Sequence, residues 1–468
     1  MRARRPQPRW TPGAAMLVVA LAHTLLFLGV FKLRLRVTGM FYYELGSDTQ
    51  HVYWPAAQKL LAGRVPYVDP RFFVEYPPLG AAFFLLPALL HPATLRAYDW
   101  LFAAQVLAVD LATLPLLARL ARRQGVSAVG AVAAYGLLLP LLGSLVSQRY
   151  DLVPATLTLG AILALLDRRP ALAWGLLLLA TLLKLYPAVL APLFLLYEWR
   201  SLPVATRRGR DWGGLMRRGR GVALYAAGLA GSTLAWQLVA PASLARFIAW
   251  ETRRGIEIES LWGTVAELAH VVTGLPAHKI DSYGSYDVVS AVSPALTVLS
   301  TVATAGLLAA IYVSYARRAP SPLVPWLPGP RDSGRGSGVG TRPSPTVGAG
   351  AGGEGDSRLL VTYATLAVLA VLLGSKLLSI QFLLWLLPLL AAQPHRPRRV
   401  VALALGVVLL SQWIYPMHWH DLWNFVPGLI LQLALRNALL AAIFILLWRD
   451  RDRAAPGSIG ALRVERAP

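Results

Sequence analysis

Long apolar runs recur along the whole chain, separated by shorter polar segments. Most runs hold about 15–22 residues, close to the ~20 that an α-helix needs to cross a hydrocarbon core ~30 Å thick. Leu, Ala and Val follow one another without the alternation of apolar and polar residues that is typical of membrane strands. The pattern predicts an all-α fold, a polytopic bundle of transmembrane helices.

We predict about twelve spans. They cover approximately residues 14–31, 97–118, 127–146, 152–166, 171–184, 187–199, 221–240, 290–313, 359–374, 378–392, 399–414 and 425–447. The first run follows a basic stretch without a small-residue cleavage site, so we expect a span rather than a signal peptide. Residues 79–90 are too few to cross a bilayer, and we expect them to be interfacial or re-entrant.

The distribution of charge predicts the orientation in the membrane. Of the 45 Lys and Arg residues, 30 fall in alternate segments that include both termini. Basic loops stay in the cytoplasm, so we expect both termini to be cytoplasmic. Lys32, Arg34 and Arg36, at the outer end of the first span, are a local exception. The net charge of +22 is therefore explained by membrane topology, and we expect membrane lipids rather than nucleic acid as partners.

Composition divides the chain into two membrane modules. Residues 1–318 hold spans one to eight, with the first outer loop at residues 32–96. Residues 319–357 are rich in Gly, Pro and Ser, which cannot bury a core, and are predicted to be a disordered cytoplasmic linker. Residues 358–448 form the C-terminal module with spans nine to twelve, and residues 449–468 form a cytoplasmic tail.

The first outer loop carries the candidate chemistry. It is polar, rich in aromatic residues and contains Asp48, which we interpret as a catalytic base. The alternative for Asp48 is a solvated loop acid or a helix cap. The chain lacks cysteine, which excludes disulfides, zinc–thiolate sites and a thiol nucleophile.

Further charged and aromatic motifs fall in later outer segments. They are Gln-Arg-Tyr-Asp at residues 148–151, Lys-Leu-Tyr-Pro at 184–187, the long segment 241–289, and the turns near 376–381 and 415–423. A carboxylate can take the proton of an attacking hydroxyl. Arg and Lys can hold a phosphate and stabilise it as it leaves. The combination suits transfer of a sugar from a lipid phosphate to a hydroxyl.

In these motifs the chain resembles the GT-C superfamily of polytopic glycosyltransferases, and it is most similar to glycosyltransferase family 87, polyprenol-phosphate-mannose-dependent mannosyltransferases. The resemblance is carried by residues 48–53, 63–67, 75–79, 149–151, 184–187, 254–262 and 379–385. Their order and spacing across the outer loops is the specific part.

The resemblance implies an inverting transfer of a hexose, mannose by analogy, from a polyprenyl-phosphate donor to a lipid or glycan acceptor of the cell envelope, on the extracytoplasmic side. Asp48 would be the base and no cofactor would be needed. The candidates for the donor phosphate are Arg149, Lys184, Arg254 and Lys376. The candidates for further substrate contacts are His51, Tyr53, Glu75, Tyr76, Asp151, Glu259, Gln381 and His418.

Several of these residues have simpler interpretations. Asp151 could cap the span that it precedes. Lys184 could snorkel from a span end to the interface. Asp110 lies inside a span, where a charge needs a partner, and Arg436 is a possible one.

His418, His420 and Asp421 superficially suggest a metal site. Residues i and i+2 of a helix do not face each other, however, so we expect no metal there.

Two other functions compete with the transferase. Buried charges in a helical bundle also fit a transporter or lipid flippase. Such a protein needs its polar residues near the middle of the bilayer and often in related halves, whereas here they lie in outer loops without a repeat. The third possibility is a non-catalytic relative that keeps the fold.

Overall fold

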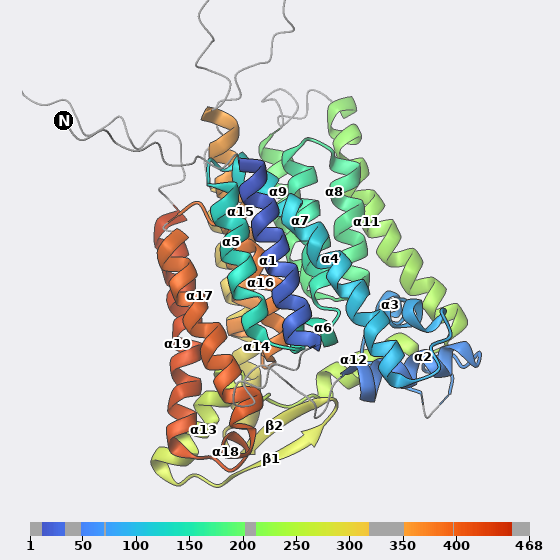
Figure 1. Ribbon diagram of the computed structural model, residues 1–468, viewed down its shortest axis with the longest axis vertical. Coiled ribbons are helices and arrows are strands. Elements are labelled where there is room, and N and C mark those ends of the chain that lie inside the picture. The colour runs from blue at the N-terminus through green and yellow to red at the C-terminus, as the bar shows by residue number, and fades with distance from the viewer. Residues whose placement is uncertain are drawn as a thin grey trace, which may run out of the picture.

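The computed structural model is a bundle of helices that run roughly along one direction (Figure 1). It describes residues 12–32, 48–69, 72–201, 212–317, 351–395 and 397–451. The predicted basic N-terminus, most of the predicted linker and most of the tail lie outside the described residues, as do Arg34 and Arg36.

Each of the twelve predicted spans overlaps a helix of the described chain. These helices are α1 (Pro12–Lys32), α4 (Leu95–Arg123), α5 (Ala128–Leu138), α7 (Leu152–Leu166), α8 (Pro170–Leu183), α9 (Ala191–Arg200), α11 (Trp212–Val239), α14 (Ser293–Ala316), α15 (Ala351–Gly374), α16 (Leu383–Ala391), α17 (Pro397–Gln412) and α19 (Pro427–Asp450).

Within the described residues, six helical segments are long and apolar enough to cross a membrane. They are residues 95–123, 219–239, 293–316, 357–374, 397–417 and 427–450. The other apolar helices have 10–17 residues, so the count of twelve crossings stays a prediction. The fold is that of a largely helical membrane protein.

The centre of the bundle is formed by helices that are apolar on all sides. In the apolar window of α15, 89% of the residues are buried, and nearly every residue of α7 is buried. The corresponding share is 6% for α11 and 17% for α14, which therefore lie at the rim and present apolar surface outward. A helix that is hydrophobic all round needs neighbours or lipid on every face.

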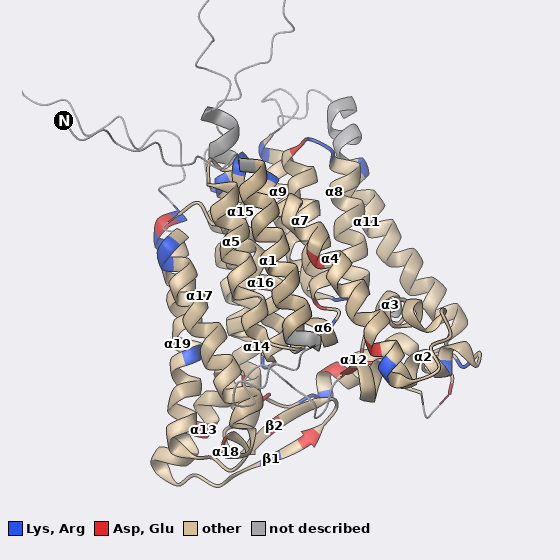
Figure 2. Cartoon of the chain, in the orientation of Figure 1, with Lys and Arg blue, Asp and Glu red and all other residues tan. Residues whose placement is uncertain are grey.

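Basic residues gather at one end of the bundle (Figure 2). There Arg119 and Arg123 of α4 both pair with Asp167 at the end of α7. Arg358 of α15 donates to the backbone carbonyl of Gln124, 2.8 Å away. These bonds tie the ends of three helices together.

The opposite end carries the shorter elements (Figure 1). They are η1 (Thr49–Tyr53), α2 (Trp54–Leu61), α3 (Pro78–Ala88), α6 (Leu145–Gln148), α12 (Ser243–Arg253), α13 (Leu261–Thr273), β1 (Ala277–Ser282), β2 (Ser285–Ser290), η4 (Ile380–Phe382), η5 (Trp413–Met417) and α18 (Trp419–Trp423). Helix α3, predicted as an interfacial or re-entrant segment, has eleven residues and packs against α2, α4 and α8.

Strands β1 and β2 form an antiparallel hairpin that the all-α prediction did not include. Their register runs from Ala277 opposite Ser290 to Ser282 opposite Ser285. Tyr283 and Gly284 form the turn, with φ of 49° and 70°. Two central residues with positive φ match the twist of a two-residue hairpin. The strands are half polar, so a search for apolar runs passes over them.

The proposed pairing of Asp110 with Arg436 is wrong. Asp110 bonds instead to His23 at 2.5 Å and to the Tyr135 hydroxyl at 2.7 Å. Arg436 donates to the backbone carbonyl of Glu259 at 2.8 Å. The sequence does not specify how each helix is rotated about its axis, and this rotation decides which buried polar groups meet.

Candidate active site

Asp48 lies immediately before η1 (Thr49–Tyr53), and three residues converge on its carboxylate. Arg149 forms an ion pair with it, in which the two side chains are 9% and 15% exposed. The hydroxyls of Tyr53 and Tyr76 donate to the same carboxylate from 3.2 and 3.4 Å. The structure thus brings together four predicted site residues from three separate stretches of the sequence.

Aromatic rings form the wall behind Asp48. Tyr53 is fully buried and stacks on Phe84, with ring centres 4.1 Å apart. The Tyr150 ring meets Tyr76 edge-on at 5.2 Å. The Tyr150 hydroxyl donates to the backbone carbonyl of Leu183 at 2.9 Å, which fixes the ring at the end of α8. Such packing holds the hydroxyls of Tyr53 and Tyr76 in place toward the carboxylate.

Lys184 forms a second ion pair next to the first. Its Nζ lies 2.5 Å from Oδ1 of Asp151, and the Trp385 indole donates to the same oxygen from 2.7 Å. Lys184 is therefore held by a buried carboxylate rather than free to reach solvent as a snorkelling lysine would. Its Nζ also lies 5.1–5.7 Å from the ring centres of Tyr76, Tyr150, Phe382 and Trp385.

Arg254 connects the first outer loop to the β-hairpin. Its guanidinium lies 3.1 Å from Glu75 and donates to the turn carbonyls of Tyr283 and Gly284, each at 3.0 Å. Glu251 is a further partner at 3.5 Å. Burial raises the pKa of Glu75, and the Arg254 charge opposes that rise. Arg254 thus has a clear structural role in this arrangement.

Lys376 closes the end of α12. Its ammonium donates to the backbone carbonyls of Thr252 and Arg254. The Lys376 carbonyl in turn accepts the Glu257 amide at 3.0 Å. Burial raises the pKa of Glu257 to about 8, and the neighbouring Glu259 carboxylate adds to the shift. Glu257 was not among the site residues predicted from the sequence.

Glu259 lies deeper, between the outer segments and α19. Its carboxylate accepts the backbone amide of Ile380 at 3.2 Å, and its carbonyl accepts from Arg436. Burial raises the pKa of Glu259. Gln381 bonds to the Ser379 hydroxyl at 2.5 Å. Glu259 therefore anchors the turn that carries Gln381.

Neither of the two predicted histidines bonds to Asp48 within the described part of the chain. His51 is exposed, and its ring has no hydrogen bond or ion pair within the described ranges. His418 bonds to Asp421 at 2.9 Å and packs on Trp413. Among the residues that the structure describes, no group of three His, Cys, Asp or Glu side chains could hold a metal ion.

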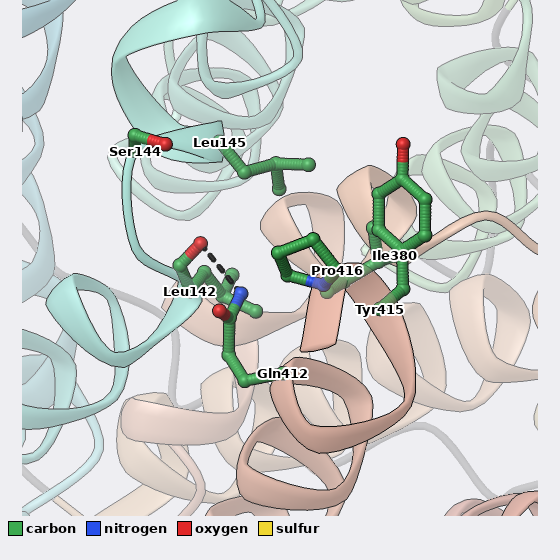
Figure 3. Close-up of a pocket in the computed structure, with 7 residues that line it drawn as sticks. All are labelled: Leu142, Ser144, Leu145, Ile380, Gln412, Tyr415 and Pro416. Atoms are coloured by element: carbon green, nitrogen blue, oxygen red, sulfur yellow. Dashed lines mark hydrogen bonds between the residues drawn. The ribbon is translucent and has the colours of Figure 1, made fainter. Parts of the chain in front are cut away.

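A small pocket opens beside the segment that leads into Arg149. Figure 3 shows Leu145 and Pro416 on facing sides of it, with the Gln412 amide bonded to the Leu142 carbonyl at 2.8 Å. The lining residues are Leu142, Ser144, Leu145, Ile380, Gln412, Tyr415 and Pro416. The pocket thus lies between α6, η4 and η5.

Sequence reasoning missed two organising residues. Trp385 holds Asp151, and its position one helical turn after Gln381 was the available signal. Asp287 of β2 accepts from the Gly255 amide at 3.0 Å and from the hydroxyls of Ser282 and Ser285 at 2.8 and 2.6 Å. It fixes the hairpin against the segment after Arg254.

An apolar helical bundle with paired acids and bases at one end is the arrangement of a membrane enzyme that acts at the bilayer surface. A model of glycosyltransferase family 87 matches residues 73–327, more than half of the 468 residues. The chain belongs to glycosyltransferase family 87. A comparison with curated proteins gave no match.

The protein is therefore a membrane glycosyltransferase, and the family match favours glycosyl transfer over transport. The matched range contains Glu75, Arg149, Lys184 and Arg254. Asp48 lies before it, so the family match does not itself assign the base.

Proposed function

We propose that the protein transfers a hexose, with inversion, from a polyprenyl-phosphate donor to a hydroxyl of a cell-envelope glycolipid or glycan. The observation that carries this proposal is the position of Asp48. Its carboxylate lies in an aromatic-walled cluster with Arg149, and Lys184 lies beside them over the same Tyr76 ring. A base and two cations within one cluster are what the reaction needs.

The reaction is a single displacement. Asp48 takes the proton of the acceptor hydroxyl as that oxygen attacks the anomeric carbon. The bond between the anomeric carbon and the phosphate oxygen breaks, and polyprenyl phosphate leaves with the electron pair. Arg149 and Lys184 stabilise the negative charge that grows on the phosphate. Attack opposite to the leaving group inverts the anomeric configuration.

In this proposal Arg149 binds two anions in turn, the Asp48 carboxylate and the donor phosphate. It is paired with Asp48 in the structure, and a carboxylate held by a guanidinium accepts a proton poorly. A donor phosphate offers Arg149 a bidentate partner. When Arg149 turns to the phosphate, Asp48 is released as a base at the moment when a sugar is present.

The other candidates take supporting roles. Tyr53 and Tyr76 orient Asp48, and Asp151 orients Lys184. Arg254 and Lys376 hold the hairpin and the end of α12, and add positive potential near the phosphate. We propose that Glu75, Glu259 and Gln381 lie around the bound substrates, and that His51 and His418 lie at the edge of the substrate-binding region.

The donor, the sugar and the side of the membrane rest on different grounds. A polyprenyl phosphate and mannose follow from the resemblance to family members. The extracytoplasmic side follows from the predicted threading, in which 30 of the 45 Lys and Arg residues fall in cytoplasmic segments. We expect a multi-pass protein of the cell membrane.

Transfer in lipid nanodiscs tests the proposal. Wild type and Asp48→Asn are incubated with radiolabelled polyprenyl-phosphate hexoses and a total lipid and glycan extract. Wild type is expected to transfer one hexose, and a folded Asp48→Asn at least about 100-fold more slowly, since general-base catalysis contributes 10²–10⁴-fold. Equal transfer by both would remove Asp48 from its role. No transfer by wild type from any donor would contradict the donor class.

A further inference from the structure

We call Asp48, Arg149, Tyr53 and Tyr76 the Asp48 cluster. Beyond this cluster, three aromatic side chains form a surface that has no role in the proposed reaction. Tyr286 of β2 packs on Trp419 and Trp423 of α18, with ring centres 4.7 and 5.8 Å apart. The two tryptophans are 5.9 Å apart, one helical turn from each other on the same face of α18. We call Tyr286, Trp419 and Trp423 the aromatic platform.

The platform is accessible. Tyr286 is 38% exposed, although its ring contacts two tryptophans, and both tryptophans are half-buried. A large aromatic cluster that stays partly open to solvent is typical of a ligand-binding surface.

The platform is continuous with the Asp48 cluster on two sides. The carbonyl of Tyr286 accepts the Ile258 amide at 2.9 Å, in the segment that follows Arg254. Burial and the Asp281 carboxylate raise the pKa of the Tyr286 hydroxyl, and the Arg149 charge opposes that rise.

The second connection runs through the pocket of Figure 3. Tyr415 lines this pocket and meets Trp419 edge-on at 5.1 Å. The opposite wall is formed by Ser144 and Leu145, at the start of the short helix that ends before Arg149. The pocket thus bridges the platform and the segment that carries Arg149.

One polar group borders the platform. Asp281 stands directly opposite Tyr286 in the hairpin register and is exposed. Its carboxylate can accept hydrogen bonds at the edge of a ring that lies flat on the aromatic faces.

We propose that the aromatic platform binds a sugar ring of the acceptor. The inference rests on the proposed function, because it places the ring next to the hydroxyl that Asp48 activates. One face of a pyranose presents C–H bonds with slight positive charge, and the face of an aromatic ring is negative. A hydroxyl at the edge of the pyranose donates to the Asp281 carboxylate. The acceptor is therefore a neutral glycan or a glycolipid with a hexose at its end.

Kinetics test this assignment directly. In nanodiscs, the amount of acceptor extract and the concentration of polyprenyl-phosphate donor are varied separately for wild type, Trp423→Ala and Tyr286→Ala. Each variant is expected to raise the half-saturating amount of extract about fivefold or more, and to leave that of the donor unchanged. Trp423→Phe keeps an aromatic face and is expected to recover most of the loss.

Trp100, 42% exposed near the start of α4, provides a matched control. Trp and Tyr also anchor helices at the membrane interface, and loss of such an anchor would affect Trp100→Ala and Trp423→Ala alike. Equal effects of these two variants would therefore overturn the assignment. A rise in the half-saturating donor concentration in Trp423→Ala, or no change in that of the extract, would overturn it as well.

A binding measurement separates this inference from the proposed function. Saturation-transfer NMR with methyl α-D-mannopyranoside and methyl α-D-glucopyranoside needs neither donor nor turnover. Wild type and Trp100→Ala are expected to transfer saturation to the ring protons of at least one glycoside, and Trp423→Ala to lose at least half of the signal. Absence of the signal in wild type would refute the platform, whether or not sugar transfer is observed.

Discussion

Lys184 and Asp151 show at the scale of single residues how charge is kept in an apolar bundle. Their side chains are 15% and 2% exposed, and the Trp385 indole completes the carboxylate's hydrogen bonds. A buried ion pair is tolerated when both partners are satisfied, whereas removal of one partner leaves an uncompensated charge. The contribution of this ion pair to stability can therefore be measured separately from its contribution to catalysis.

We predict that Asp151→Asn lowers the free energy of unfolding by about 3–5 kcal/mol, because Lys184 then keeps a buried charge without a carboxylate. The double variant Asp151→Asn with Lys184→Met removes both charges and is expected to regain much of the lost stability. It should still transfer sugar poorly, since the phosphate has lost a cation. Thermal unfolding and transfer rates, measured on the same nanodisc samples, check both parts. A stable double variant with wild-type transfer would contradict the role of Lys184.

Glu257 predicts a pH dependence of stability. Its pKa is about 8 in the folded protein, above the ordinary value of 4.5. Between these values the folded protein keeps the proton and the unfolded chain loses it, so the free energy of unfolding falls as pH rises, by at most about 1.4 kcal/mol per unit. Glu257→Gln removes this contribution. We expect the unfolding midpoint of wild type, relative to Glu257→Gln, to be lower at pH 8 than at pH 5. A constant difference would show that Glu257 does not titrate in this way.

At the scale of elements, the β1–β2 hairpin determines how the outer segments meet. Arg254 donates to the carbonyls of the hairpin turn and reaches Glu75 of the first outer loop with the same guanidinium. Gly284 makes this contact possible. Its φ is 70°, and a Cβ there would lie 2.3 Å from the Glu75 carboxylate.

Alanine substitutions at two glycines with the same backbone conformation distinguish the effect of local backbone strain from the effect of losing the contact with Glu75. Gly274 has φ of 74° and open space around its Cβ position. Gly274→Ala is expected to cost about 1–2 kcal/mol of stability, for the left-handed conformation alone, and to leave transfer unchanged. Gly284→Ala also displaces Glu75, so we expect an additional loss of transfer of about tenfold. Equal transfer by the two variants would show that the Glu75–Arg254 contact is unimportant for activity.

The sequence predicted elements well where a single physical signal defines them. Residues 152–166 are apolar between Asp151 and Asp167, and α7 has these bounds. The hairpin was missed because its strands are half polar, and a search for apolar runs passes over them. Tyr283-Gly284 was an available turn signal. Pro187 and Pro192 divide the predicted span 187–199 into a 3-10 turn and the shorter α9.

The site was predictable as a set of residue types but not as a set of contacts. Asp48 was a candidate from the first outer loop, and Arg149 and Lys184 were candidates from the outer motifs together with the family resemblance. The sequence does not show that Arg149 pairs with Asp48 or that Asp151 holds Lys184. The partners in these contacts are separated by 33 to about 100 residues in the sequence. The rotation of helices likewise decided the partner of Asp110, which sequence reasoning assigned wrongly.

At the scale of the whole molecule, the two ends of the bundle differ in chemistry. One end carries Arg119, Arg123 and Arg358 in contacts that join helix ends. The other end carries the Asp48 cluster, the hairpin and the aromatic platform (Figure 1). The positive-inside rule predicts that the first end lies in the cytoplasm.

Absence of native cysteine makes this orientation simple to measure. Thr273→Cys lies at the end of α13 and Arg169→Cys at the start of α8, and both positions are exposed. In intact cells, a membrane-impermeant thiol reagent is expected to label Thr273→Cys. Arg169→Cys should react only after the membrane is permeabilised. The reverse labelling would place the Asp48 cluster in the cytoplasm and contradict the proposed side of transfer.

The central claim is that Asp48 and the donor phosphate compete for Arg149. Equilibrium binding of a fluorescent polyprenyl phosphate to wild type, Asp48→Asn and Arg149→Gln, together with transfer rates of the same samples, tests it most directly. We expect Asp48→Asn to bind the lipid phosphate at least as tightly as wild type while transfer is lost, and Arg149→Gln to bind it about tenfold or more weakly. Weaker lipid binding by a folded Asp48→Asn, or wild-type binding by Arg149→Gln, would contradict the claim.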